Sequence, residues 1–320
     1  MVGPANSAAA ACWYLTGATA SGKTGVGIAL ARILDAEIIS MDSMAVYRGM
    51  DIGTAKPSLE QRSEIPHHLI DIVDPDEDFS VALYLKQARE ASETMVARGK
   101  RVLFVGGTPL YLKALLRGID EGPPADWSFR AEVIAEVQQV GPKSLHARLQ
   151  QVDPLSAARL PQSDIRRIVR ALEYHYLTGR PISHVQLHFD EAAPDTHRVF
   201  ALQWPRSVLH QRIQDRVESM FSMGLVDEVG ALIARHGELG RTAAQAVGYR
   251  EVLAHIRSGV PLETTLELVK TRTRQFAKRQ ETWFRGISEC RFFARSPNDD
   301  LASVAAQIAA IGMAEISQTP

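Results

Sequence analysis

The chain has 320 residues, of which 45% are hydrophobic and 23% are charged, and this ordinary globular composition is enough for two hydrophobic cores. The formal net charge is −1, so a site for a polyanion must come from a local cluster of basic side chains. The two cysteines, Cys12 and Cys290, exclude a disulfide framework and a Cys-x-x-Cys zinc site, and they predict a reducing, cytoplasmic location. No apolar run approaches the ~20 residues that span a bilayer, so we expect no membrane partner.

Residues 17–24 match the phosphate-binding loop pattern Gly-x-x-x-x-Gly-Lys-[Ser/Thr]. An apolar run typical of a buried strand, 12–15, precedes the loop, and a helical run, 26–34, follows it. In this context backbone N–H groups and the helix N-terminus bind a polyphosphate, while Lys23 contacts its terminal phosphate and Thr24 holds Mg²⁺. The predicted diphosphate-binding residues are Gly17, Ala18, Thr19, Ala20, Ser21, Gly22, Lys23 and Thr24.

Strand-like and helix-like segments alternate after the loop. The expected elements are strand 36–40, helix 80–98, strand 101–105 and helix 110–116. Strands separated by helices predict a parallel sheet, whose ligands lie at the carboxyl ends of the strands. Gly17, Asp42 and Gly106 follow three such strands, so we expect them to converge on one crevice.

A boundary signal, Gly-Ile-Asp-Glu-Gly-Pro-Pro, stands at residues 118–124. The expected later elements are helices over 127–179, a loop to about 197, strand 198–202, helices from 207, and a C-terminal helix over 299–316. We therefore predict an α/β fold, a P-loop NTPase-like parallel sheet flanked by helices with a helical insertion domain. The core would comprise residues 11–120 and 196–318, and the insertion would comprise residues 121–195.

Asp42 opens a polar segment directly after the predicted strand 36–40. A carboxylate at a strand end beside a phosphate loop can hold Mg²⁺, act as a general base on the acceptor, or cap a helix. The segment Gly106-Gly107-Thr108 can bring backbone and a hydroxyl close to a ligand, or form a turn with a threonine cap. The residues alone leave these alternatives open.

Two helical segments carry arginine pairs at a spacing of four residues, which places each pair on one face. Within 163–173, Arg166 and Arg170 suit either successive phosphates or a solvated surface. Arg212 and Arg216 repeat the spacing, and they suit either the phosphate crevice or an ion pair on the helix surface.

A third basic helix is expected at 266–287. Its cationic arc comprises Lys270, Arg274, Lys278 and Arg285. Its expected inward face comprises Leu266, Val269, Phe276, Trp283, Phe284 and Ile287. Since only Glu267 and Glu281 offset the charge, the arc predicts a surface for polyphosphate or nucleic acid.

Taken together, these stretches resemble a tRNA dimethylallyltransferase of the bacterial type. The resemblance rests on residues 17–24, 42–43, 46–57, 66–71, 106–108, 110–111, 164, 166–168, 170–173, 247–250, 277–280 and 282–283. These segments follow one another in order, so the resemblance covers almost the whole chain.

The resemblance implies transfer of a five-carbon prenyl group from dimethylallyl diphosphate to the exocyclic amine of an adenosine. That adenosine is at position 37 of tRNAs reading codons that begin with uridine. Loop 17–24 would bind the diphosphate of this donor rather than ATP, with Mg²⁺ near Thr24. Asp42 matches the family's general base, Thr108 a tRNA-contacting threonine, and Arg216 an arginine that contacts the diphosphate. The expected catalytic residues are Asp42, Thr108, Lys23 and Arg216.

The resemblance also implies one macromolecular partner, the tRNA anticodon stem-loop, bound by a monomer. The expected tRNA contacts are Asp42, Ser43, Met44, Ala45, Thr108, Arg130, Arg166, Arg167, Ile168, Val169, Arg170, Gln245, Gly248, Tyr249, Arg250, Arg274, Lys278, Arg279, Gln280, Trp283 and Arg285. Two positions depart from the family pattern, Ala18 in place of proline and Ala45 in place of glutamine. Because backbone amides bind the phosphates, we expect little effect from Ala18, whereas we expect Ala45 to alter a contact with the anticodon loop.

Two other functions fit part of the pattern. A kinase acting on a nucleoside or small metabolite would use the loop, Asp42 as a metal ligand, and Arg166, Arg167 and Arg170 as a lid. Such a kinase has no need of the basic arc on 266–287. An RNA-binding module regulated by nucleotide would lack transfer chemistry, and the position of Asp42 beside the loop argues against it.

Overall fold

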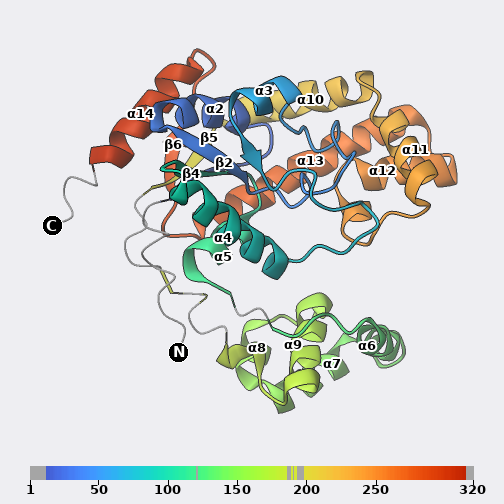
Figure 1. Cartoon of the computed structure of the whole chain (residues 1–320). Helices are drawn as coiled ribbons and strands as arrows, with labels where there is room; N and C mark the ends of the chain where they lie inside the picture. Colours follow the sequence, from blue (N-terminus) through green and yellow to red (C-terminus); the bar gives the residue numbers. More distant parts are fainter. Residues whose placement is uncertain (1–11, 120–121, 186–188, 190, 193–197, 315–320) are drawn as a thin grey trace. The chain divides into compact units, whose positions relative to one another are not determined.

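The computed structural model describes residues 12–119, 122–185, 189, 191–192 and 198–314. The chain divides into two compact units, one comprising Met1–Leu116 and Ala193–Pro320 and the other Arg117–Ala192. The larger unit contains the sheet and the smaller one is helical (Figure 1).

The sheet of the larger unit has six parallel strands in the order β3-β2-β4-β1-β5-β6. The strands are β1 (Trp13–Gly17), β2 (Ala36–Ser40), β3 (His67–His68), β4 (Arg101–Val105), β5 (Val199–Gln203) and β6 (Arg291–Ala294). Strand β1 pairs with β4 on one side and with β5 on the other, so Leu15 stands opposite both Val105 and Phe200. The predicted parallel sheet is confirmed. The edge strands β3 and β6 have only 2 and 4 residues, too few for the sequence pattern to reveal them.

Helices cover both faces of this sheet. The helices of the larger unit are α2 (Lys23–Leu34), α3 (Leu59–Glu64), α4 (Val81–Ala97), α5 (Pro109–Arg117), α10 (Arg206–Ser222), α11 (Leu225–His236), α12 (Tyr249–Ser258), α13 (Leu262–Arg285) and α14 (Leu301–Ala314). Because successive side chains of a strand point to opposite faces, Trp13 and Leu15 pack in one cluster with α2 and α14. Cys12 and Tyr14 pack in another cluster with α4, α5, α11 and α12.

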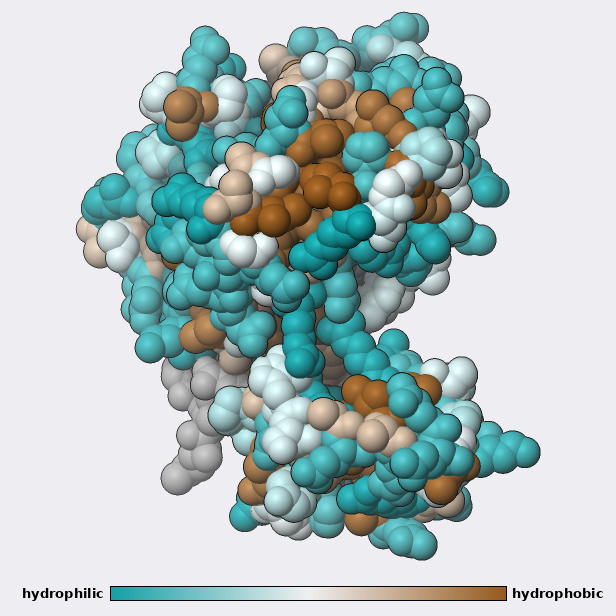
Figure 2. Space-filling model, turned by 90° about the vertical axis from the view of Figure 1, so that its right-hand side faces the viewer, coloured by the Kyte–Doolittle hydropathy of each residue, from teal (hydrophilic) through white to brown (hydrophobic). Residues whose placement is uncertain are grey.

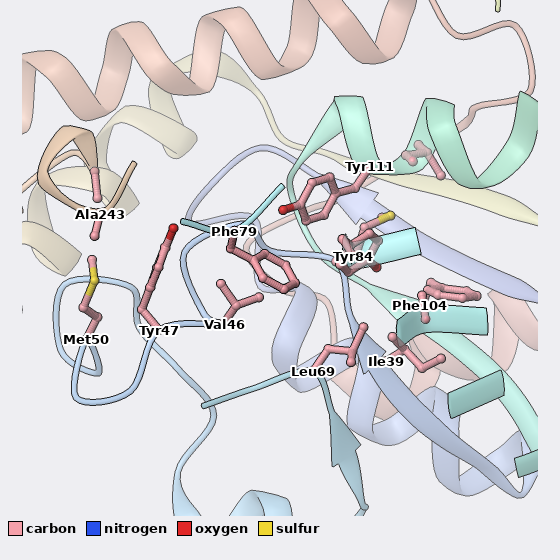
Figure 3. Packing of buried hydrophobic residues seen from close by; sticks show 14 of the residues in the cluster. Ile39, Val46, Tyr47, Met50, Leu69, Phe79, Tyr84, Phe104, Tyr111 and Ala243 are labelled. Atoms are coloured by element: carbon pink, nitrogen blue, oxygen red, sulfur yellow. The ribbon is translucent and has the colours of Figure 1, made fainter. Parts of the chain in front are cut away.

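A tyrosine pair in this second cluster fixes the end of β2. The rings of Tyr84, on α4, and Tyr111, on α5, stack with their centroids 3.9 Å apart (Figure 3). The Tyr84 hydroxyl donates a hydrogen bond to the carbonyl of Ser40, the last residue of β2. The stacked pair therefore supports the strand end that precedes Asp42.

The described residues of the smaller unit form α6 (Trp127–Val140), α7 (Pro142–Val152), α8 (Pro154–Arg159), α9 (Ile165–Thr178) and a short 3-10 helix, Ile182–His184, around a hydrophobic cluster of their own. The helical stretch expected over 127–179 breaks at Gly141, whose φ is 83°, at Asp153 and again over 160–164. Each of the first two breaks is followed by a proline at the first helical position, where the missing N–H costs no hydrogen bond.

The ends of several predicted segments fall outside the described residues, namely 11, 120–121, 193–197 and 315–318. Figure 2 faces the end of the larger unit that carries α11 and α12, and it shows hydrophobic residues gathered within hydrophilic surroundings. Within the described part of the chain, no helix has both the length and the apolar character that crossing a bilayer requires.

Candidate active site

Three strand ends meet at the carboxyl edge of the sheet, as expected from Gly17, Asp42 and Gly106. The Gly106 amide donates to the carbonyl of Leu15, and the Met41 amide donates to the carbonyl of Val105. A Cβ atom at Gly106 would lie only 2.1 Å from the Met41 carbonyl oxygen, so only glycine allows this approach. A single pocket is lined by residues from all three loops.

The phosphate-binding loop has the bent backbone that its glycines predict, with φ of 140° at Gly17 and 86° at Gly22. Ala20 also has a positive φ of 61°. Ala18 and Ala20 are buried in a cluster with side chains of α10 and α13, and the Trp204 indole donates to the Ser21 carbonyl. The side chains of Ala18 and Ala20 thus anchor the loop in the protein interior. Its other residues Thr19, Gly22, Lys23 and Thr24 line the pocket.

Lys23 lines the pocket. Its ammonium donates to the carbonyls of Gly17 and Ala18, at 3.0 and 2.8 Å. Burial, together with the positive charge of Arg216, lowers the pKa of Lys23 to about 7, although the nearby carboxylate of Asp42 acts in the opposite direction. An anion that binds beside Lys23 would pair with its ammonium and favour the charged form.

Two arginines of α10 reach the same loop. Arg216 donates to the Thr19 hydroxyl at 3.3 Å, and Arg212 donates to the Ala20 carbonyl at 2.8 Å. Burial lowers the pKa of Arg216, whereas Asp42 raises it. Of the two alternatives for Arg216, the structure supports the crevice over a surface ion pair, since the side chain lines the pocket.

Asp42 lines the pocket beside these cations. Its Oδ1 accepts a hydrogen bond from the Met44 amide at 2.9 Å, and residues 43–46 form turns rather than a helix. The helix-cap alternative for Asp42 is therefore wrong, and the carboxylate faces the crevice as a base or a metal ligand would. Thr108 accepts a hydrogen bond from the Ser43 amide at 3.0 Å, so it holds the Asp42 turn in place.

Apolar side chains also line the pocket. Its apolar lining residues include Ile38, Ala45, Ala55, Pro57, Ile70, Val105 and Phe276. Lys56 also lines the pocket, and its side chain, only 1% exposed, donates to the Tyr47 carbonyl and pairs with Asp51 and Asp71. Sequence reasoning singled out no role for Lys56, although its motif was part of the family resemblance. The site therefore combines cations that suit a charged group with apolar side chains that suit a hydrocarbon.

The residues around Thr24 fit a Mg²⁺ ion that shares its ligands with a diphosphate. Thr24 and Asp42 offer oxygen atoms to the same pocket, and Mg²⁺ favours few protein oxygens combined with phosphate oxygens and water. Among the described residues, no three His, Cys, Asp or Glu side chains gather into a metal site of their own. An ion here would therefore depend on oxygens of the substrate.

The expected faces of helix 266–287 are partly wrong. Lys270 is 8% exposed and pairs with Glu218 and Glu267, so it is not part of an open cationic arc. Phe276 and Trp283, expected inward, are 37% and 42% exposed. The buried face of α13 instead includes polar residues, which the apolar periodicity could not identify. Those buried polar residues are Thr265, Lys270, Thr273 and Gln280.

Of the predicted RNA contacts on α13, the side chains of Lys278, Arg279 and Arg285 are exposed and Arg274 is half-buried. Gln280 is 4% exposed and lines the pocket, so it is not part of the exposed surface of α13.

The predicted contact segment 245–250 contains one clear correction. The Tyr249 ring is fully buried, and its hydroxyl donates to Glu228 at 2.5 Å, so its side chain is unavailable to RNA. Gly248 is also buried, Arg250 pairs with Glu251, and Gln245 is exposed. Tyr249 and Glu228 thus support the fold rather than the RNA surface.

The predicted RNA contacts in the smaller unit also divide into buried and exposed side chains. Ile168 and Val169 are buried in its core, which excludes side-chain contact with RNA. Arg130 and Arg170 both bind Glu173, whose side chain is fully buried. The remaining two predicted contacts, Arg166 and Arg167, are exposed, with Arg167 paired to Asp164.

Comparison with known proteins gives the family of the chain. Residues 45–287 match the family model "IPP transferase". A tRNA dimethylallyltransferase of Rhodopirellula baltica is 51% identical over 300 residues, which cover 91% of this chain and 90% of the relative. One of Pelotomaculum thermopropionicum is 42% identical, over 92% of this chain and 94% of that relative.

Solved structures agree with this comparison. The structure of the full-length tRNA isopentenylpyrophosphate transferase of Bacillus halodurans aligns with a TM-score of 0.69 and 36% identity, covering 96% of this chain and 98% of that one. A eukaryotic dimethylallyltransferase acting on tRNA aligns with a TM-score of 0.78 and 28% identity, covering 96% of this chain and 79% of that one. This chain belongs to the IPP transferase family.

Proposed function

We propose that this protein transfers the dimethylallyl group of dimethylallyl diphosphate to the exocyclic amine of the adenosine at position 37 in tRNA. The tRNAs are those reading codons that begin with uridine, and the second product is diphosphate. One observation carries the proposal: a single pocket is lined by the cations Lys23 and Arg216, by Asp42, whose charge acts on both, and by apolar side chains. This combination suits a donor that has a diphosphate at one end and a branched hydrocarbon at the other.

The residues have distinct roles in this reaction. The adenine leaves its stack, and its amine attacks the first prenyl carbon while Asp42 accepts a proton from that amine. The carbon–oxygen bond to the diphosphate breaks, and negative charge accumulates on the leaving group. Loop amides, Lys23 and Arg216 stabilise that charge. Mg²⁺ bound at Thr24 would neutralise part of it when present.

Exposed cations of α13 provide the surface for the anticodon stem-loop. Lys278, Arg279 and Arg285 suit the phosphates of RNA, while the flipped base enters the pocket. Arg166 and Arg167 of the smaller unit are proposed as further contacts, with a role for that unit in RNA binding. We also propose that the enzyme acts as a monomer in the cytoplasm.

A kinase acting on a small metabolite is the alternative that the loop alone favours. The family of the chain argues against it, because the curated relatives are tRNA dimethylallyltransferases.

The test offers bulk tRNA together with either labelled dimethylallyl diphosphate or labelled ATP. We expect label to reach tRNA only from the prenyl donor. Label transferred from the γ-phosphate of ATP to any acceptor would support the kinase instead. The Asp42→Asn variant should bind tRNA normally and lose single-turnover transfer, and near-normal transfer by it would exclude Asp42 as the base.

A further inference from the structure

Gln280 connects two of the loops that build the active site. Its Oε1 accepts a hydrogen bond from the Thr19 amide at 2.8 Å, and its Nε2 donates to the Gly107 carbonyl at 2.6 Å. Thr19 belongs to the phosphate-binding loop after β1, and Gly107 follows β4. A buried side chain of α13 therefore holds both loops at a fixed separation.

The fit around this amide is close and chemically specific. A Cβ atom at Gly107 would lie 2.8 Å from Nε2 of Gln280, so glycine makes room for the amide. One partner is an N–H group and the other is a carbonyl, so the side chain must accept and donate at once. A primary amide does both, whereas a carboxylate or an apolar side chain of the same length cannot.

The same helix fixes the loop through a second contact. Ala277, one turn before Gln280, packs in a cluster with Ala18 and Ala20 of the phosphate-binding loop. Lys278 and Arg279 stand between these two buried residues in sequence and are exposed. The residues proposed to bind RNA and the residues that hold the phosphate-binding loop thus lie on the same turn of α13.

We propose that Gln280 is a positioning residue that couples RNA binding on the exposed face of α13 to diphosphate binding at residues 17–24. The inference deepens the proposed function and rests on it for the identity of the RNA. RNA that shifts or rigidifies α13 changes the position of the Thr19 amide through Gln280. Linkage then requires that diphosphate changes RNA affinity by the same factor.

The experiment compares Gln280→Met with Gln275→Met, a matched control. Gln275 is an exposed glutamine of the same helix that accepts a hydrogen bond from Arg272, so the chemical change is identical. Calorimetry measures the affinity for inorganic pyrophosphate with and without an anticodon stem-loop RNA, and RNA affinity and melting temperature are measured beside it.

In the unaltered protein and in Gln275→Met, we expect RNA to change pyrophosphate affinity by about 5-fold or more, the ordinary range of coupling between sites. In Gln280→Met, we expect pyrophosphate to bind about 10-fold more weakly and the effect of RNA to vanish, with RNA affinity unchanged. A loss of RNA affinity with unchanged pyrophosphate affinity would show that Gln280 contacts RNA, and it would overturn the inference.

A second variant keeps the inference testable if Gln280→Met does not fold. In Gln280→Glu, the carboxyl can donate to the Gly107 carbonyl only when it is protonated. The ratio of its pyrophosphate affinity to that of the unaltered protein should therefore rise as pH falls from 8 towards 5, and a constant ratio would contradict the inference. Pyrophosphate binding needs no turnover, so these measurements do not depend on prenyl transfer. If the unaltered protein failed to transfer the prenyl group, that result would refute the proposed function alone.

Discussion

Glu228, to which the sequence analysis gave no role, holds the turn at residues 51–53. Replacing it should unfold this turn. The Oε2 of Glu228 accepts hydrogen bonds from the amides of Asp51 and Ile52, at 3.0 and 2.7 Å. Its Oε1 accepts from the amide of Gly53 and from the Tyr249 hydroxyl, at 3.3 and 2.5 Å. Successive backbone N–H groups of a turn form a concave site for an anion, and here a carboxylate of α11 occupies it. This turn leads directly into the pocket-lining residues 54–57.

The size of the effect follows from the donors that Glu228→Ala would leave unpaired. The hydrogen bond of the Asp51 amide is exposed, so water can replace its partner, whereas the hydrogen bonds of the Ile52 amide and the Tyr249 hydroxyl are partly shielded from water. Each shielded donor left without an acceptor costs about 1–3 kcal/mol, so the free energy of unfolding should fall by about 4 kcal/mol. For a unit of this size, that corresponds to a fall in melting temperature of roughly 10 °C.

Asp227→Asn is the matched control for this variant. Asp227 and Glu228 are neighbours in the first turn of α11, where either carboxylate interacts favourably with the helix N-terminus. Thermal and urea unfolding should show a loss below about 1 kcal/mol for Asp227→Asn. The Michaelis constant for the prenyl donor should rise only in Glu228→Ala. If the two variants unfold alike, Glu228 does not hold the turn and the reasoning is refuted.

Three further predictions concern charge. The pKa of Lys23 is about 7 in the free site, so diphosphate should bind more weakly as pH rises above 7, and its binding at pH 8 should take up a proton. Calorimetry in buffers of different ionisation enthalpy measures this proton uptake, and a finding of no uptake would contradict the prediction. Arg130→Met removes one of the two arginines that pair with the buried Glu173, so the smaller unit should lose about 3 kcal/mol at pH 7. Burial raises the pKa of Glu173, but hydrogen bonds from Arg130 and Arg170 lower it overall. The stabilisation by this ion pair is therefore complete above the ordinary glutamate pKa and is lost as pH falls through the lowered value. The melting temperatures of Arg130→Met and the unaltered protein should converge in acid, and a constant difference between them would exclude this ion pair. Lys278→Ala should reduce the salt dependence of tRNA affinity by about one phosphate contact, and an unchanged slope would show that Lys278 faces no phosphate.

The parts of the site that the sequence predicted are those encoded by local pattern. The loop 17–24 and the strand ends before Asp42 and Gly106 could be located because glycines and apolar runs mark them directly. The reach of Arg216 into the crevice was one of two open alternatives, since helical spacing fixes a face but not its neighbour.

The parts that the sequence did not predict depend on contacts between distant residues. Gln280 was expected among the tRNA contacts because the family resemblance implies it, yet its side chain is buried and makes two hydrogen bonds. Lys270 joined the cationic arc on spacing alone, because the acidic Glu218 that covers it comes from α10. Nothing in the local sequence identified Glu228, whose partners lie 175 to 177 positions away in the chain and on α12.

The central claim is that Lys23 and Arg216 hold a diphosphate that departs, and that carbon rather than phosphorus is transferred. It is tested most directly by one single-turnover reaction with a donor labelled with tritium in the prenyl group and with ³²P in the diphosphate. The account predicts that tritium enters tRNA and that all ³²P is released as pyrophosphate in equal amount. The appearance of ³²P on the RNA would contradict it.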